Sequence, residues 1–200
     1  PVEQEAQIRL LEKLQNHKGQ DSLRVFRPAD AEETTVCWAM AMENMETPTA
    51  LIFSRQNIAE LPAGNDYEQA RKGAYVVAGS DDPFDVILLA SGSEVSTLEA
   101  GKELLEKDGV RCRVVSAPSE GLFRRQSKEY QESVLPTGSK IFGMTAGLPV
   151  TLEGLVGIGP NSRIFGMKSF GFSAPYKVLD EKLGFTAENV YKQVKDFLGK

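Results

Sequence analysis

A strand–helix–strand pattern in the middle of the chain restricts the possible folds more than any other feature. Residues 84–90 read Phe-Asp-Val-Ile-Leu-Leu-Ala, a short apolar run typical of a strand that is buried on both faces. A helical pattern follows over residues 94–107 and ends at Gly109, and residues 110–116 form a second strand pattern. Two strands joined by a helix of this length are typical of a parallel pair with a right-handed crossover. The sequence therefore predicts an α/β fold with a mostly parallel sheet.

The first part of the chain repeats this alternation on a smaller scale. We expect helices over residues 3–14 and 30–44, and strands over residues 23–27 and 49–53. The order helix, strand, helix, strand corresponds to the tail of a doubly wound α/β domain. The apolar side chains singled out in the two helices are Ile8, Leu11 and Leu14 on one face of the first, and Met40, Met42 and Met45 in or just after the second. The methionines are expected to pack against the sheet rather than to form a soft binding surface.

A turn-rich, polar stretch divides the chain. Residues 61–72 contain the run Leu-Pro-Ala-Gly-Asn-Asp and lack periodicity, which indicates a linker. We therefore expect one unit over residues 1–60 and a second over residues 73–200. The second unit is predicted to be a three-layer α/β domain with a mostly parallel sheet.

The remaining elements of the second unit are less regular. Asp81-Asp82-Pro83 predicts a hairpin turn between the strand at 84–90 and one at 74–78. The stretch that runs from Pro118 through Phe123-Arg124-Arg125 is predicted to be a loop. Further strands are expected at residues 140–144 and 162–167, and further helices at residues 130–135, at 149–155, and after Thr186 as N-cap, with Phe185 and Val190 as a hydrophobic staple.

Composition and residue counts exclude several classes of function. The apolar fraction of 41% and the net charge of −5 are those of an ordinary globular protein without a footprint for nucleic acid or an anionic membrane. No apolar run approaches the length of a membrane span, and no secretory leader pattern is present. Cys37 and Cys112 are expected to be buried thiols rather than a disulfide. The single histidine, His17, is expected to lie in an exposed turn, which disfavours a zinc site and a Ser-His-Asp hydrolase.

Arg55 is the strongest candidate for a binding residue. It follows the predicted strand at 49–53, and ligands of open α/β sheets lie just beyond the carboxyl ends of the strands. An arginine there can grip a phosphate or a carboxylate with its planar fork of donors. An ion pair at a strand end is the simpler alternative. Ser54 and Gln56 flank Arg55, and they are expected to support the loop or to touch a ligand.

Three other groups of residues have a structural explanation beside a functional one. Asp30 and Glu33 form either an acid/base pair or the caps of the helix that starts there, with Arg27 as a nearby ion-pair partner. Residues 91–94, Ser-Gly-Ser-Glu, lie between a strand and a helix and are a weak candidate for a phosphate cradle. Arg124-Arg125 is most simply a solvated pair, with an anion site as the alternative.

Several motifs, taken in order, resemble the C-terminal part of the transketolases. They are Pro-Val-Glu-Gln at 1–4, Arg-Pro-Ala-Asp-Ala-Glu-Glu at 27–33, Ser-Arg-Gln-Asn at 54–57, Gly-Ser-Glu-Val at 92–95, Phe-Gly-Phe-Ser-Ala-Pro at 170–175 and Gly-Phe-Thr-Ala-Glu-Asn at 184–189. No single motif is decisive, but the ordered set is specific and extends over almost the whole chain. The resemblance implies the end of a pyrimidine-binding domain over 1–60, cut inside that domain, followed by a C-terminal domain over 73–200.

The resemblance also implies a function. Transketolases transfer a two-carbon ketol unit between sugar phosphates with thiamine diphosphate and Mg²⁺ (or Ca²⁺), as cytoplasmic homodimers in the pentose phosphate pathway. Arg55 matches the arginine that binds the substrate phosphate in this family. The diphosphate-binding domain, the activating glutamate and the histidine-rich loop of the family have no counterpart in these residues. The chain alone is therefore expected to be inactive, to need the rest of a transketolase chain as its partner, and to bind neither cofactor nor metal.

One departure and two alternatives remain. Transketolases usually carry Val-Glu-Ala-Gly where this chain has Met-Thr-Ala-Gly at 144–147, so the acidic residue is replaced by Thr145. The first alternative is another thiamine enzyme, such as a deoxyxylulose-phosphate synthase or a ketoacid dehydrogenase β-subunit. The second is a non-catalytic dimerisation or regulatory module. The sequence does not identify the preferred sugar phosphates or an effector of the second unit.

Overall fold

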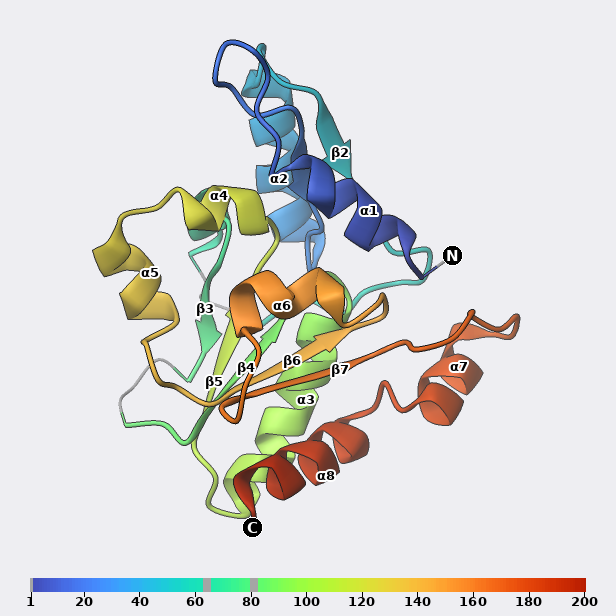
Figure 1. The fold of residues 1–200 in the computed structure, drawn as a ribbon. Coiled ribbons are helices and arrows are strands. Elements are labelled where there is room, and N and C mark those ends of the chain that lie inside the picture. The colour runs from blue at the N-terminus through green and yellow to red at the C-terminus, as the bar shows by residue number, and fades with distance from the viewer. Residues whose placement is uncertain (1, 63–65, 80–82) are drawn as a thin grey trace.

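The part of the chain that the structure describes contains two β-sheets, one in each unit (Figure 1). The computed structural model describes residues 2–62, 66–79 and 83–200. The first sheet has two strands and the second has five, in the order β3-β5-β4-β6-β7. The prediction of a partial α/β unit followed by a larger, mostly parallel one is confirmed.

The first unit consists of two helices and two parallel strands. Its elements are α1 (Gln4–Leu11), β1 (Arg24–Phe26), α2 (Ala31–Glu43) and β2 (Thr49–Leu51). Val25 is paired with Ala50 in the centre of the parallel ladder. The strands are shorter than their sequence patterns, and residues 52–57 leave β2 as an irregular loop.

A capping box starts α2, as the sequence predicts. The Asp30 carboxylate accepts a hydrogen bond from the Glu33 amide at 2.9 Å, and Glu33 Oε2 accepts one from the Ala29 amide at 2.8 Å. Because these bonds satisfy amide groups at the helix start, they account for both carboxylates without an acid/base role.

The burial of α1 is opposite to the amphipathic pattern of its sequence. Leu11 and Leu14, two residues of the predicted apolar face, are exposed, whereas Arg9 and Glu12 are buried against the second unit. The expectation for the methionines is also wrong at two of three positions, because Met40 is buried but Met42 and Met45 are exposed. The buried charges of α1 and of Glu12 directly after it belong to a polar network between the units.

The five-stranded sheet is parallel except at one edge. Its strands are β3 (Tyr75–Ala78), β4 (Val86–Ala90), β5 (Cys112–Ser116), β6 (Ile141–Thr145) and β7 (Ser162–Gly166). β3 pairs antiparallel with β5, and β5 separates it from β4. The predicted hairpin between β3 and β4 is therefore wrong. Two residues of its predicted turn, 81 and 82, lie outside the described residues.

Helices cover both faces of this sheet, as expected for a three-layer domain (Figure 1). Successive strand residues alternate between two apolar clusters: Leu88 belongs to the cluster with α3 and α8, and Ile87 to the cluster with α4, α5 and α6. The helices are α3 (Glu94–Lys107), α4 (Glu120–Arg124), α5 (Lys128–Val134), α6 (Val150–Val156), α7 (Tyr176–Leu183) and α8 (Ala187–Leu198). Thr186 caps α8 as predicted, through a bond from the Asn189 amide at 3.3 Å. The sequence patterns missed α4, which was expected to be a loop, and α7.

The linker is more ordered than its composition indicates. It contains the 3₁₀ helix η1 (Tyr67–Lys72), while residues 63–65 lie outside the described residues. Arg71 of η1 forms a forked ion pair with Glu43 at 2.8 and 3.2 Å, and the Tyr67 hydroxyl lies 3.0 Å from Asp30 Oδ2. The linker is therefore packed along α2.

Expectations for the sulfur and imidazole groups are confirmed. Cys37 and Cys112 are free and buried, and burial raises the pKa of the Cys112 thiol to about 12. His17 lies exposed in a turn. No helix within the described ranges combines the length and apolar character needed to cross a membrane.

Candidate functional site at the junction of the two units

The carboxyl ends of β4 and β6 meet strand ends of the first unit. From β4 the chain crosses to β5 on one side of the sheet, while β6 lies on the other side, so β4 and β6 flank the topological switch point. In open α/β sheets this crevice is the usual place for a ligand. Residues 91–94 follow β4 and residues 146–147 follow β6. The ends of β1 and β2 face the same crevice.

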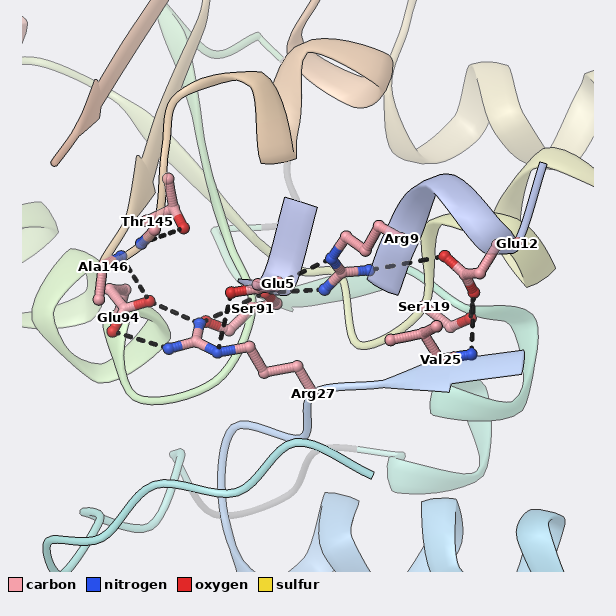
Figure 2. Close-up of polar contacts among 11 residues, drawn as sticks. Glu5, Arg9, Glu12, Val25, Arg27, Ser91, Glu94, Ser119, Thr145 and Ala146 are labelled. Carbon is pink, nitrogen blue, oxygen red and sulfur yellow. Dashed lines mark hydrogen bonds and ion pairs between the residues drawn. The ribbon is translucent and has the colours of Figure 1, made fainter. Parts of the chain in front are cut away.

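Arg27, directly after β1, is the central residue of this junction (Figure 2). Its buried guanidinium donates to Glu94 Oε2 at 2.5 Å and to Glu94 Oε1 at 3.2 Å, and it also donates to the Ser91 carbonyl. Burial lowers the pKa of Arg27, but the carboxylates of Glu94 and Glu5 raise it more, so the net shift is upward. Arg27 therefore stays cationic, and its partner is Glu94 rather than the predicted Asp30 or Glu33.

The Glu94 carboxylate lies in residues 91–94, the candidate phosphate cradle of the sequence. Its carboxylate accepts from Arg27, from the Ser93 hydroxyl at 2.8 Å and from the Ala146 amide at 3.2 Å. A phosphate in this cradle would have to compete with a buried, fully bonded carboxylate of the same sign. The structure therefore disfavours the phosphate-cradle interpretation of residues 91–94.

Glu5 and Arg9 of α1, and Glu12 directly after it, extend the network from Arg27 to Ser119 (Figure 2). Arg9 donates to Glu5 at 3.0 Å and to the Ser91 hydroxyl at 3.3 Å, and it lies 3.9 Å from Glu12. Glu12 in turn accepts from the Val25 amide at 3.0 Å and from the Ser119 hydroxyl at 3.3 Å. Burial raises the pKa of Glu12, and the charge of Arg9 partly offsets this shift.

The five ionised side chains alternate in sign. Their order is Glu12, Arg9, Glu5, Arg27 and Glu94, with three carboxylates and two guanidinium groups. We call this set the junction network. It joins α1 and β1 of the first unit to the start of α3 and the end of β6 in the second. Each of its charges has an opposite charge within ion-pair distance, as burial requires.

A cleft of about 430 Å³ opens beside the junction network. One wall is the loop after β2, including Ser54, Gln56 and Asn57, and the facing wall is the start of α3, including Ser93 and Thr97. Arg27 and Glu94 form part of the floor, and α7 contributes Tyr176 and Asp180. Burial, together with the nearby charge of Glu94, raises the pKa of Asp180. The volume is within the usual range for small-molecule sites.

Arg55 does not line this cleft, although both of its neighbours do. Its side chain is exposed, whereas Ser54 and Gln56 are half-buried, so Arg55 faces solvent between two residues that line the cleft. Within the described residues, the Arg55 guanidinium has no hydrogen-bond or ion-pair partner. The simpler sequence-based alternative, an ion pair at the strand end, is thus not formed among the residues that the structure describes.

The Asp30 and Glu33 carboxylates tie α2 to the rest of the chain. Asp30 Oδ2 accepts from the Leu61 amide and the Tyr67 hydroxyl, both at 3.0 Å, and Glu33 accepts from the Tyr75 hydroxyl at 2.8 Å. Burial raises the pKa of Glu33 to about 6, despite its hydrogen bonds. Both groups lie away from the junction cleft and serve as connections to the linker and to β3.

The remaining sequence candidates have partners within the protein. Arg124 bonds Glu120 at 2.8 Å and the Gly154 carbonyl at 2.8 Å, and Arg125 is paired with Asp21, but both side chains remain exposed, as expected for a solvated pair. Thr145 is buried and accepts a bond from the Gly147 amide at 3.1 Å. Among the described residues, no three metal-ligating side chains converge, so a divalent metal has no ligand set here.

Sequence patterns alone did not identify the junction network. The arginine in the Arg-Pro-Ala-Asp motif and the glutamate in the Gly-Ser-Glu motif were both noted, but in separate roles. Only the topology brings Arg27 and Glu94 together. The one local signal is Gly92, since a side chain at this position would overlap the guanidinium of Arg27.

Comparison with known proteins gives a consistent family assignment. Residues 73–186 match the family described as the transketolase-like C-terminal domain. A transketolase from Staphylococcus epidermidis is 40% identical over 199 residues, which cover 98% of this chain and 28% of the relative. The transketolase structure from Leishmania mexicana has a TM-score of 0.85 and 34% identity, covering 100% of this chain and 27% of that one. A Pichia stipitis transketolase in complex with sedoheptulose 7-phosphate has a TM-score of 0.85 and 31% identity over the same shares. The chain thus spans somewhat more than a quarter of the length of these relatives.

Proposed function

The chain belongs to the transketolase family, and we propose that it acts as the C-terminal segment of a transketolase polypeptide that transfers ketol units between sugar phosphates. The observation that carries the proposal is collinearity, because 98% of this chain aligns with one continuous 28% share of a curated relative. The reaction, the substrates and the partners belong to the complete protein. In that protein, the cofactor would supply the carbanion chemistry, and this segment would supply substrate binding and structure.

Arg55 is the residue that we assign to the substrate phosphate. Its guanidinium is exposed, has no partner within the described chain, and follows the carboxyl end of a parallel strand. A phosphate can accept two of its donors at once, which a lysine at this position could not match. We assign supporting roles to Ser54 and Gln56, because they line the cleft on the opposite side of the loop.

For the complete protein, the proposal includes thiamine diphosphate with its Mg²⁺ or Ca²⁺ ion and a homodimer. It also includes a cytoplasmic location. The described residues contain no metal ligand set, so they do not fit the metal. We therefore propose that the 200-residue chain alone is inactive and does not bind thiamine diphosphate. Titration calorimetry with thiamine diphosphate and Mg²⁺ is expected to show no binding heat, and measurable ketol transfer by the purified chain would contradict this proposal.

Substitution of Arg55 in the complete polypeptide tests the assigned role. Arg55→Gln is expected to raise KM for a ketose phosphate about tenfold to a hundredfold, since charge-assisted bonds contribute about 1.5–3 kcal/mol. The kcat/KM for the same ketose without its phosphate is expected to stay unchanged. Arg71→Gln, at another surface arginine, is the matched control. An equal loss with both substrates would contradict the phosphate role.

A further inference from the structure

Residue 27 is the point at which the first unit is fixed to the second. The Arg27 amide donates to the Pro118 carbonyl at 2.9 Å, and the Arg27 carbonyl accepts from the Gly92 amide at 3.0 Å. The side chain of Arg27 then continues across the junction to Ser91 and Glu94. Backbone and side chain of one residue thus hold β1 against the segments that follow β4 and β5.

The second unit has a space that fits the Arg27 side chain. Gly92 has a φ angle of +65°, and a Cβ atom at this position would lie 2.5 Å from the Cζ atom of Arg27. Glu94 fixes the fork of the guanidinium with both carboxylate oxygens and anchors itself to the Ala146 amide. Glycine at position 92 is therefore required both by the backbone and by the guanidinium packed on it.

The loop that carries Arg55 depends on this fixed point. β2 is the ladder neighbour of β1, and the Ile52 amide donates to the Phe26 carbonyl at 2.8 Å, one residue before Arg27. Beyond Ile52, the side chains of Ser54, Gln56 and Asn57 make no hydrogen bond within the described chain. The position of the loop relative to the cleft is thus set at its base, where β1 and β2 end, together with the Phe53 ring that stacks on Trp38 of α2.

From this arrangement we propose that Arg27, held by Glu94, is a positioning residue that sets where Arg55 meets the substrate phosphate. The proposal rests on the proposed function, because it needs Arg55 as the phosphate ligand. Arg27 lines the cleft, but its buried guanidinium is bonded to Glu94 and Ser91, so the proposal gives it no direct contact with Arg55 or the substrate phosphate. Loosening the Arg27–Glu94 pair would let the base of the loop shift, and a displacement of about 1 Å is enough to impair a positioned contact.

The main test uses Arg27→Lys in the complete transketolase polypeptide, with ketose phosphate and unphosphorylated ketose as paired substrates. Lysine keeps the charge but cannot bond both oxygens of Glu94 and the Ser91 carbonyl in one plane. We expect KM for the ketose phosphate to rise about three- to tenfold, and by clearly more than KM for the unphosphorylated ketose. The matched control is Arg71→Lys, which breaks a forked arginine–glutamate pair of similar geometry on the surface.

Gly92→Ala provides a second variant that retains both charges. Its methyl group would displace the Arg27 guanidinium, so the same phosphate-selective rise in KM is expected. If Arg27→Lys fails to give a folded protein, Glu94→Gln replaces it as a neutral variant of nearly the same shape. Unchanged KM values in the folded variants would overturn the proposal, as would equal losses with both substrates, which indicate a general structural role.

The Arg55→Gln variant separates the two proposals. If Arg55→Gln has no phosphate-selective effect, the proposed function of Arg55 fails, and the positioning role fails with it. If Arg55→Gln raises KM for the ketose phosphate but Arg27→Lys and Gly92→Ala do not, only the positioning role of Arg27 is wrong.

Discussion

The two units of the chain differ in how far each can bury its side chains by itself. In the second unit, all residues of β4 and β5 are buried, and helices pack apolar side chains on both faces of the sheet. In the first unit, α1 buries Arg9 and Glu12 and exposes Leu11. Its neighbour α2 buries one face but leaves Trp38 and Met42 exposed. The second unit therefore has a core of its own, whereas the first has a two-stranded sheet that is too small to form one.

This difference shows what orders the first unit. Phe26, Val36 and Cys37 belong to the same apolar cluster as α3 and α8, and the junction network adds buried ion pairs at the other side of β1. Both groups of contacts are made with the second unit or with the linker. Buried ion pairs are costly to break but add little net stability when intact. We infer that the first unit is folded only while it is packed against the core of the second unit. The junction network then fixes the orientation of the first unit.

The largest expected effect comes from the core of the second unit. Leu88→Ala removes a side chain of β4 that is 0% exposed, and it should lower the free energy of unfolding by about 3 kcal/mol. The matched substitution Leu11→Ala, at a leucine of α1 that is 46% exposed, should change it by less than about 1 kcal/mol. Urea denaturation followed by circular dichroism measures both values.

The single tryptophan sharpens this experiment. Trp38 lies in α2, so its fluorescence reports on the first unit while circular dichroism reports on the whole chain. If the first unit depends on the second for its stability, Leu88→Ala shifts the fluorescence transition and the circular dichroism transition to the same lower urea midpoint. A tryptophan transition that stays at its wild-type midpoint would show that the first unit is stable by itself.

Local patterns predicted the elements well and their partners less well. The strand–helix–strand pattern at 84–116, the capping box at Asp30 and the N-cap at Thr186 were all confirmed, because each depends on nearby residues. The hairpin between β3 and β4 was wrong because β5 inserts between them, and the sequence between the strands carries no record of that pairing. Helix α4 was taken for a loop because it is only five residues long.

The same limit explains what was missed at the site. Periodicity assigns the inside of a helix from its apolar face, which fails for α1 because its buried side faces a polar junction. Arg27 and Glu94 are 67 residues apart in the sequence, so only the folded chain shows them as a pair. Arg55 stays a prediction that rests on two local features, a strand end and a cation, whereas the exposure of its side chain outside the cleft was not predictable from them.

An intermediate effect on stability is expected from Glu33 of α2, which accepts a hydrogen bond from Tyr75 of β3. Burial raises the pKa of Glu33 from its ordinary value of 4.5 to about 6, so the folded protein binds this proton more tightly than the unfolded chain does. The resulting stability is present in full below pH 4.5 and is lost as the pH rises through 6, with a total of about 2 kcal/mol. Glu33→Gln should remove this part of the pH dependence. Denaturation curves between pH 4.5 and 7.5 measure it, and an unchanged slope in the variant would contradict the prediction.

The smallest effect on stability is expected at the exposed apolar residues of the first unit. These residues contrast most clearly with the buried Leu88. Met45 is 89% exposed, so Met45→Ser should change the free energy of unfolding by less than about 0.5 kcal/mol. The same substitution should lower the binding of a hydrophobic dye, because Met45 and Met42 are apolar surface that the rest of this chain leaves uncovered. Met40→Ser is the matched control: Met40 is buried, so its loss should destabilise the protein by about 2–5 kcal/mol. If Met45→Ser and Met40→Ser lowered the free energy of unfolding equally, Met45 would be buried in solution. The first unit would then bury more apolar surface of its own than the structure shows.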